Sequence, residues 1–135
     1  MQYSAYYVEE KDGAFSASIS KLELKIPEDG FVQIKVSHSS LNYKDALSAS
    51  GNKGVTRNYP FVPGIDAAGT IADANSSIFK EGDEVLVTGY DMGMNTPGGF
   101  GEYINVPAGW VVKKPSTLTS VEAMSLGTAG LTAAA

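Results

Sequence analysis

Alternation of hydrophobic and polar residues is clearest in the segment from Phe31 to His38. Val32, Ile34 and Val36 fall on one side of an extended chain, and the residues between them are polar. This period of two is typical of a half-buried β-strand. The alternation also places His38 on the apolar side of the strand. A single histidine in such a place is usually structural, so we assign it no catalytic role.

Further short segments of strand-like composition lie on both sides of this one. Turn signals rich in glycine, proline and acidic residues separate them, at residues 11–13, 27–30, 81–83, 97–99 and 107–109. The pattern predicts strands at residues 2–9, 14–19, 31–38, 69–74, 83–88, 101–106 and 110–113. Many short strands at close spacing are typical of a barrel or sandwich, so the predicted fold class is mainly β.

Two segments are predicted to be helical. The first is short, residues 42–49. The second begins at Thr119, where Thr119 and Glu122 have the spacing of a capping box, in which each side chain satisfies a free backbone N–H of the first turn. Small residues follow from Gly127 to Ala135 without a stop signal for the helix.

Leu126 and Leu131 of the second predicted helix are apolar and would need another surface to cover them. We therefore expect a truncated piece of a longer protein, with residues 1–118 as one domain and residues 119–135 as the start of a junction helix. The alternative is a native short protein whose last helix packs back on the strands.

Composition narrows the functional classes. The chain has 135 residues, 43% of them hydrophobic and 19% charged, which is ordinary for one globular domain that buries roughly two-thirds of its unfolded surface. A net charge of −5 with scattered basic residues argues against a nucleic-acid partner. The sequence has no leader pattern and no apolar run of ~20 residues, so we expect a cytoplasmic protein without a membrane partner.

Metal and thiol chemistry have little support in this composition. The chain contains no cysteine and one histidine, which excludes disulfides, a thiolate nucleophile and metal sites built from cysteine or several histidines. No loop has the acidic spacing of a calcium or magnesium site. We therefore expect no metal.

Five motifs follow one another along the chain: SLNYKD at 40–45, PGIDAAG at 63–69, FKEGDEV at 79–85, GGFGEY at 98–103 and GTAGLTA at 127–133. In this order they resemble the catalytic domain of the medium-chain dehydrogenase/reductase superfamily. The first and last look most like the zinc-free, quinone-oxidoreductase-like branch of the YhdH/YhfP type, which includes acryloyl-CoA reductases.

The resemblance implies both a fold and the loss of zinc. Zinc-dependent members carry a cysteine ligand in the first motif and a histidine ligand in the second, where this chain has Asn42 and Ile65. Neither side chain is a zinc ligand. The family fold for this region is a GroES-like, partly open β-barrel with short helices, followed by a Rossmann domain. Since no G-x-G-x-x-G opens a helix after a strand here, we expect the Rossmann domain to be absent from this chain.

The function implied by the resemblance is NADPH-dependent reduction of activated double bonds in small molecules, such as quinones, enones or acryloyl-type thioesters. NADPH would be bound mainly by the missing domain, and this chain alone would be inactive. The exposed junction helix could also join two chains into a homodimer. A different class of protein fits the strand pattern as well, namely a non-catalytic GroES-like or OB-like β-barrel binding module.

Three polar residues of the first two motifs are candidates for catalysis. Asn42 follows a strand, so its amide could donate to a substrate carbonyl or to the cofactor, or it could be a helix N-cap. Asp45 lies in the first helical turn, where the helix dipole favours a carboxylate; it could also orient Asn42 or relay a proton. Asp66 could bond to the Asn42 cluster or satisfy loop N–H groups.

Two further residues are candidates for cofactor binding. The resemblance implies that Tyr43 contacts the nicotinamide or its phosphate arm, whereas an aromatic residue beside a strand end is otherwise more often in the core. It also implies that the Thr128 hydroxyl faces the nicotinamide. The alternative for Thr128 is a small residue selected for close packing.

Overall fold

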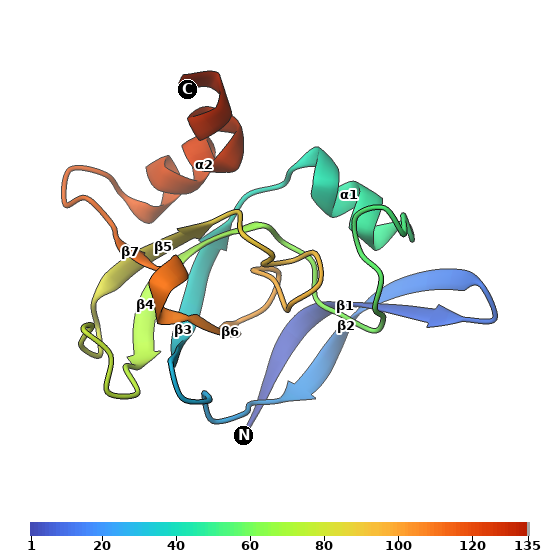
Figure 1. Cartoon of the computed structure of the whole chain (residues 1–135), viewed down its shortest axis with the longest axis horizontal. Coiled ribbons are helices and arrows are strands. Elements are labelled where there is room, and N and C mark those ends of the chain that lie inside the picture. Colours follow the sequence, from blue (N-terminus) through green and yellow to red (C-terminus); the bar gives the residue numbers. More distant parts are fainter. Residues whose placement is uncertain (135) are drawn as a thin grey trace.

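The computed structural model describes residues 1–134, the side chain of Leu131 excepted, so Ala135 of the predicted junction segment lies outside it. Figure 1 shows a mainly β molecule with a few short helices, as predicted. The helices are α1 (Tyr43–Ala49), the 3-10 helix η1 (Ala108–Trp110) and α2 (Ser120–Ala134). The strands are β1 (Gln2–Lys11), β2 (Ala14–Glu23), β3 (Phe31–Ser39), β4 (Asp66–Asp73), β5 (Glu84–Thr88), β6 (Tyr103–Pro107) and β7 (Val112–Lys113).

The strands described within residues 1–134 form two antiparallel sheets. One is the hairpin β1-β2, and the other has five strands in the order β6-β3-β4-β5-β7. The sheets do not close into a barrel, since β6 and β7 are edge strands of the larger one. This arrangement agrees with the predicted GroES-like, partly open architecture.

Strand β4 lies at the centre of the larger sheet and begins earlier than its sequence pattern predicted. Residues Asp66, Ala67 and Ala68 pair with β5, and Ala67 and Ala68 also pair with β3. All three are buried. Because this stretch is covered by packing on both faces, it shows no alternation of polar and apolar residues, and the prediction from periodicity started only at residue 69.

The core confirms the two inward positions predicted for the first half of β3, although Gln33 between them is buried as well. Val32 and Ile34 are 0% and 1% exposed and pack in one cluster with residues of β4, β5 and β6. Complete burial of each such side chain contributes about 1.5–3 kcal/mol. Val36 is only partly buried and packs against the same cluster.

The second half of β3 departs from the prediction. The register between β3 and β4 shifts between Val36 and His38, so the alternation is interrupted there. His38 is exposed, and its Nδ1 lies 3.1 Å from the Ser37 hydroxyl oxygen. Its predicted place on the apolar side was therefore wrong, because a bulge moves a side chain to the other face.

The hairpin β1-β2 is joined to the rest of the molecule by backbone hydrogen bonds. The N–H of Tyr6 donates to the carbonyl of Phe100 (2.8 Å), and Val8 and Phe61 exchange two bonds (2.9 and 3.1 Å). Glu102 donates its N–H to the carbonyl of Ser4 (3.0 Å). The hairpin thereby lies against the loops that precede β4 and β6.

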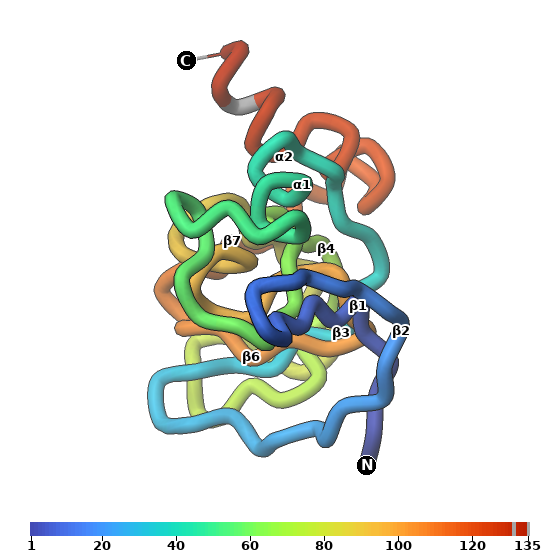
Figure 2. The backbone as a smooth tube through the Cα atoms, turned by 90° about the vertical axis from the view of Figure 1, so that its right-hand side faces the viewer, coloured from blue at the N-terminus to red at the C-terminus, as the bar shows by residue number. Residues whose placement is uncertain are grey.

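Helix α2 begins with the predicted capping box. The Thr119 N–H donates to the Glu122 carboxylate (3.0 Å), and the Glu122 N–H donates to the Thr119 hydroxyl (3.1 Å). These bonds lower the pKa of Glu122. The helix packs on β4, β3 and β5, and Figure 2 shows α2 and the N-terminus at opposite ends of the molecule. Whether a domain boundary falls between residues 118 and 119 stays a prediction.

The segment predicted as a strand at residues 110–113 is partly helical. The Val111 N–H donates to the Ala108 carbonyl (3.2 Å), which closes the 3-10 turn of η1 and leaves only two residues for β7. Among the described helices of residues 1–134, none has both the length and the apolar character that crossing a membrane requires.

We expect Ile34→Ala to lower the free energy of unfolding by about 2–5 kcal/mol, because it leaves a cavity beneath the central sheet. The matched control is Ile78→Ala, at a side chain that is 89% exposed, and its effect should stay within about 0.5 kcal/mol. Urea unfolding of both variants measures the difference. Equal losses in the two variants would show that Ile34 is not a core residue.

Candidate active site

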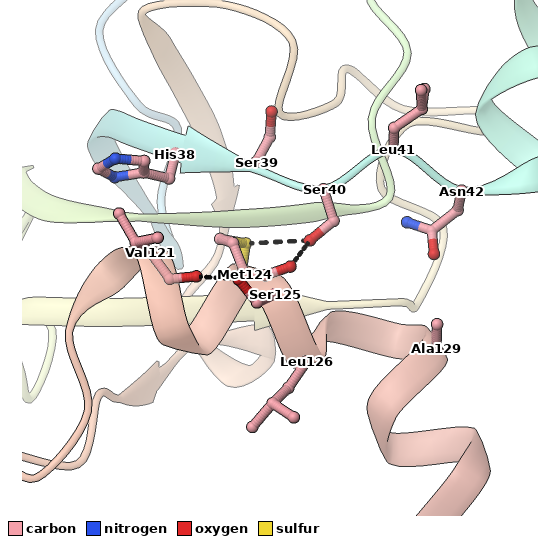
Figure 3. A pocket seen from close by; sticks show the side chains of 10 residues that line it. All are labelled: His38, Ser39, Ser40, Leu41, Asn42, Val121, Met124, Ser125, Leu126 and Ala129. Carbon is pink, nitrogen blue, oxygen red and sulfur yellow. Dashed lines mark hydrogen bonds between the residues drawn. The ribbon is translucent and has the colours of Figure 1, made fainter.

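A pocket of about 330 Å³ lies between the end of β3 and the first half of α2 (Figure 3). The polypeptide between β3 and α1 forms one wall, and α2 forms the other. The Ser40 hydroxyl points at α2 and donates to the carbonyl of Met124 (2.5 Å), which holds the two walls together. Residues along the pocket include His38, Ser40, Leu41, Asn42, Met124 and Ala129.

Asn42 occupies the N-cap position of α1 and also lines this pocket. Its backbone is extended (φ −120°, ψ 160°), as an N-cap residue requires. Its side-chain Nδ2 donates to Oδ2 of Asp66 (3.0 Å). Asn42 thus takes the N-cap position, one of the two alternatives from the sequence, while donation of its amide to a substrate or cofactor stays a prediction.

Asp66, the first residue of β4, connects three parts of the chain. Its carboxylate is 0% exposed. Oδ2 accepts hydrogen bonds from Asn42 Nδ2 and from the N–H of Thr128 (both 3.0 Å), and Oδ1 accepts from the Thr128 hydroxyl (2.5 Å). Asp66 thus bonds to Asn42, as one sequence hypothesis expected, while the backbone N–H that it satisfies belongs to α2 and not to a loop.

Thr128 follows a bend in α2 that depends on glycine. Gly127 has φ +49° and ψ −155°, which breaks the helix and directs the next N–H at Asp66. A Cβ at Gly127 would lie 2.7 Å from Asp66 Oδ2 and 2.8 Å from Ser40 Oγ. Close packing is therefore observed here, at Gly127, while the expected contact of Thr128 with a nicotinamide stays a prediction.

Asp45 lies in the first turn of α1 and holds the backbone on both sides of the site. It is 1% exposed and accepts the N–H of Asn42 (2.8 Å) and the N–H of Ile65 (2.9 Å). Burial raises the pKa of Asp45, the two N–H bonds oppose this rise, and the negative charge of Asp66 adds to it. The side chain of Asp45 thus joins the start of α1 to the loop before β4 through hydrogen bonds.

Tyr43 is the first residue of α1, and its side chain is 77% exposed. It is therefore not a core aromatic residue. A contact with a cofactor stays a prediction. Sequence reasoning missed Ser40 and the role of Gly127: the last motif contained Gly127, but nothing in the sequence showed that Ser40 reaches α2.

The charges near the pocket limit what it could hold. Within residues 1–134 no three histidine or acidic side chains lie close enough together to bind a metal ion. None of the residues that line the pocket is lysine or arginine. The amide and hydroxyl groups suit an uncharged polar ligand, whereas a phosphate group would find no lysine or arginine among the described residues along this pocket.

Comparison with known proteins identifies the domain. The alcohol dehydrogenase GroES-like domain model matches residues 28–116. The putative quinone oxidoreductase YhfP of Bacillus subtilis is 49% identical over 109 residues, which are 81% of this chain and 33% of that protein. The probable acrylyl-CoA reductase AcuI of Escherichia coli is 45% identical over 130 residues, which are 96% of this chain and 40% of that protein.

Solved structures agree with this result. The yhdH oxidoreductase from Salmonella enterica, in complex with NADP, is 43% identical with a TM-score of 0.90 over 96% of this chain and 40% of its own. The structure of Bacillus subtilis yhfP with NAD bound has 40% identity and a TM-score of 0.93 over 99% of this chain and 41% of its own. This chain thus spans about 40% of these structures.

The chain belongs to the alcohol dehydrogenase GroES-like domain family. The resemblance to the quinone-oxidoreductase-like branch of the YhdH/YhfP type is confirmed. Absence of zinc and the roles of the five candidate residues stay predictions.

We expect Gly127→Ala to lower the free energy of unfolding by about 1–3 kcal/mol, because the new methyl group meets Asp66 and Ser40 and the backbone conformation suits glycine alone. Gly109→Ala is the control, since an added Cβ there has no atom within 4 Å, and its effect should be within about 0.5 kcal/mol. Urea unfolding compares the two. An unchanged free energy of unfolding in the Gly127→Ala variant would contradict the described bend.

The raised pKa of Asp45 has a defined effect on stability. The folded state holds this proton at a pH where the unfolded state has lost it, so Asp45 contributes most below its unfolded pKa of ~3.9. That contribution is lost as pH rises through the folded pKa. The stability difference between wild type and Asp45→Asn should therefore fall with rising pH across this window. Urea unfolding at several pH values and a carbon NMR titration of the Asp45 carboxyl measure it, and a lowered pKa would contradict the prediction.

Proposed function

We propose that this chain supplies the substrate side of an NADPH-dependent, zinc-independent reductase of activated double bonds. The names of its relatives support quinones and acrylyl-CoA as substrate types, and the NADP in the Salmonella enterica structure supports the cofactor. The observation that carries the proposal for this chain is the placement of Asn42. Its amide lines the pocket and is held by a buried carboxylate.

Asn42 is the proposed hydrogen-bond donor to the substrate carbonyl. Its Nδ2 carries two hydrogens, and one of them is used by Asp66. The second is available to a substrate oxygen beside the pocket. A fixed donor of this kind stabilises negative charge that develops on oxygen, without the help of a metal.

A reduced nicotinamide supplies a hydride to the electron-poor carbon of the double bond, whose electron pair shifts to give an enolate that takes a proton from water. The contribution of this chain is to stabilise the enolate oxygen through Asn42. Removing one such donor lowers the turnover number in comparable sites by about 10²–10³-fold.

No lysine or arginine within residues 1–134 lines the pocket, so we propose that this chain alone does not bind the phosphates of a ligand there. Binding the phosphates of NADPH, or of a CoA ester, calls for lysine or arginine or for a glycine-rich turn at a helix N-terminus. The relatives are more than twice as long as this chain, and we propose that their additional length provides that function. The choice of NADPH over NADH remains a prediction. The assembly of two chains into a homodimer also remains a prediction.

A chimera tests the proposal. This chain would replace the matching 130 residues of the Escherichia coli AcuI relative. We expect the chimera to bind NADPH, seen by nicotinamide fluorescence, and to reduce acrylyl-CoA or a quinone, whereas the chain alone does neither. Asn42→Ala in the chimera should lower kcat by about 10²-fold, because the enolate loses its donor.

Asn58→Ala is the matched control, since Asn58 is exposed and lies outside the pocket beside Asn42. Its kcat should equal that of the unmodified chimera. Thermal unfolding verifies that each chimera is folded. A folded chimera that binds NADPH but reduces none of these substrates would refute the proposed function and would favour a non-catalytic binding module.

A further inference from the structure

We propose that Asp66 is the positioning residue of this site: it holds the amide of Asn42 so that nitrogen, not oxygen, is the atom fixed toward the reacting carbonyl. The inference rests on the proposed function and adds to it a residue that acts without touching the substrate. Its basis is the direction of the hydrogen bonds around the buried carboxylate.

The amide of Asn42 has two possible orientations, related by a flip of the side chain. In the observed one, Nδ2 donates to Asp66 Oδ2 over 3.0 Å. The flipped amide would bring Oδ1, an acceptor, against a carboxylate oxygen that is also an acceptor. Since Asp66 is 0% exposed, no bulk water is present to relieve that repulsion. The carboxylate therefore selects one orientation.

Asp66 can select an orientation only if it is fixed itself. Two bonds from Thr128 fix it, one from the backbone N–H to Oδ2 (3.0 Å) and one from the hydroxyl to Oδ1 (2.5 Å). The bend at Gly127 brings both donors to the carboxylate. All three groups that contact the Asp66 carboxylate are hydrogen-bond donors, so each bond fixes both the carboxylate and its neighbour.

The two buried acids divide the task of fixing Asn42. Asp45 accepts the backbone N–H of Asn42 (2.8 Å), while Asp66 accepts from the side chain (3.0 Å). Backbone and amide are thus fixed independently before any ligand arrives. Such preorganisation is what makes a single donor effective toward a developing charge.

The first test uses this chain alone and needs no activity. In nitrogen-15 NMR spectra, the two side-chain amide protons of Asn42 should be widely separated in shift, because one of them is bonded to a carboxylate. Asp66→Asn should bring the two shifts together. Ser125→Ala is the control, since Ser125 lines the same pocket but donates to Val121, and it should change neither shift. Unchanged Asn42 shifts in a folded Asp66→Asn variant would overturn the inference.

The second test is a double-mutant cycle in the chimera. Asp66→Asn should lower kcat by about 10²-fold, as a misplaced catalytic group does, and leave KM for NADPH within about threefold. If Asp66 acts through Asn42, the double variant Asn42→Ala/Asp66→Asn should be no slower than Asn42→Ala alone. Multiplying losses in kcat would overturn the inference and leave the proposed function intact. A folded, inactive chimera without substitutions would overturn both.

Discussion

The buried carboxylate of Asp66 is the interaction on which the candidate site depends. It is fully inaccessible to water, and such a charge costs several kcal/mol unless it is hydrogen-bonded. Here the three bonds come from the residue before α1 and from the bend of α2. The polypeptide must therefore bring β4, α1 and α2 to one point, and the geometry of the pocket follows from that requirement.

Much of the fold could be predicted because it depends on local patterns. The burial of Val32 and Ile34 in β3 and the capping box at Thr119 were both confirmed. The start of β4 and the position of His38 could not be predicted. The first is buried by strands paired from elsewhere in the chain, and the second follows from a bulge. Long-range pairing determines both features, and no local period reports it.

The candidate site was predictable as a set of residues but not as a set of contacts. The motifs contain Asn42, Asp45 and Asp66, and the structure places all three within one hydrogen-bonded cluster. The direction of each bond remained open, because an asparagine amide is both a donor and an acceptor. The bond between Ser40 and Met124 joins residues 84 positions apart, and only tertiary structure reveals it.

Burying two acids has opposite consequences for the stability of the domain and for the proposed chemistry. Burial raises the pKa of Asp45, and the charge of Asp66 adds to this rise, so Asp45 contributes less to the stability of the domain near neutral pH than at acidic pH. Each acid holds a different part of Asn42, however, and the amide beside the pocket would be free to turn without them. This loss of stability is thus the physical counterpart of the proposed donor, which is fixed before any substrate binds.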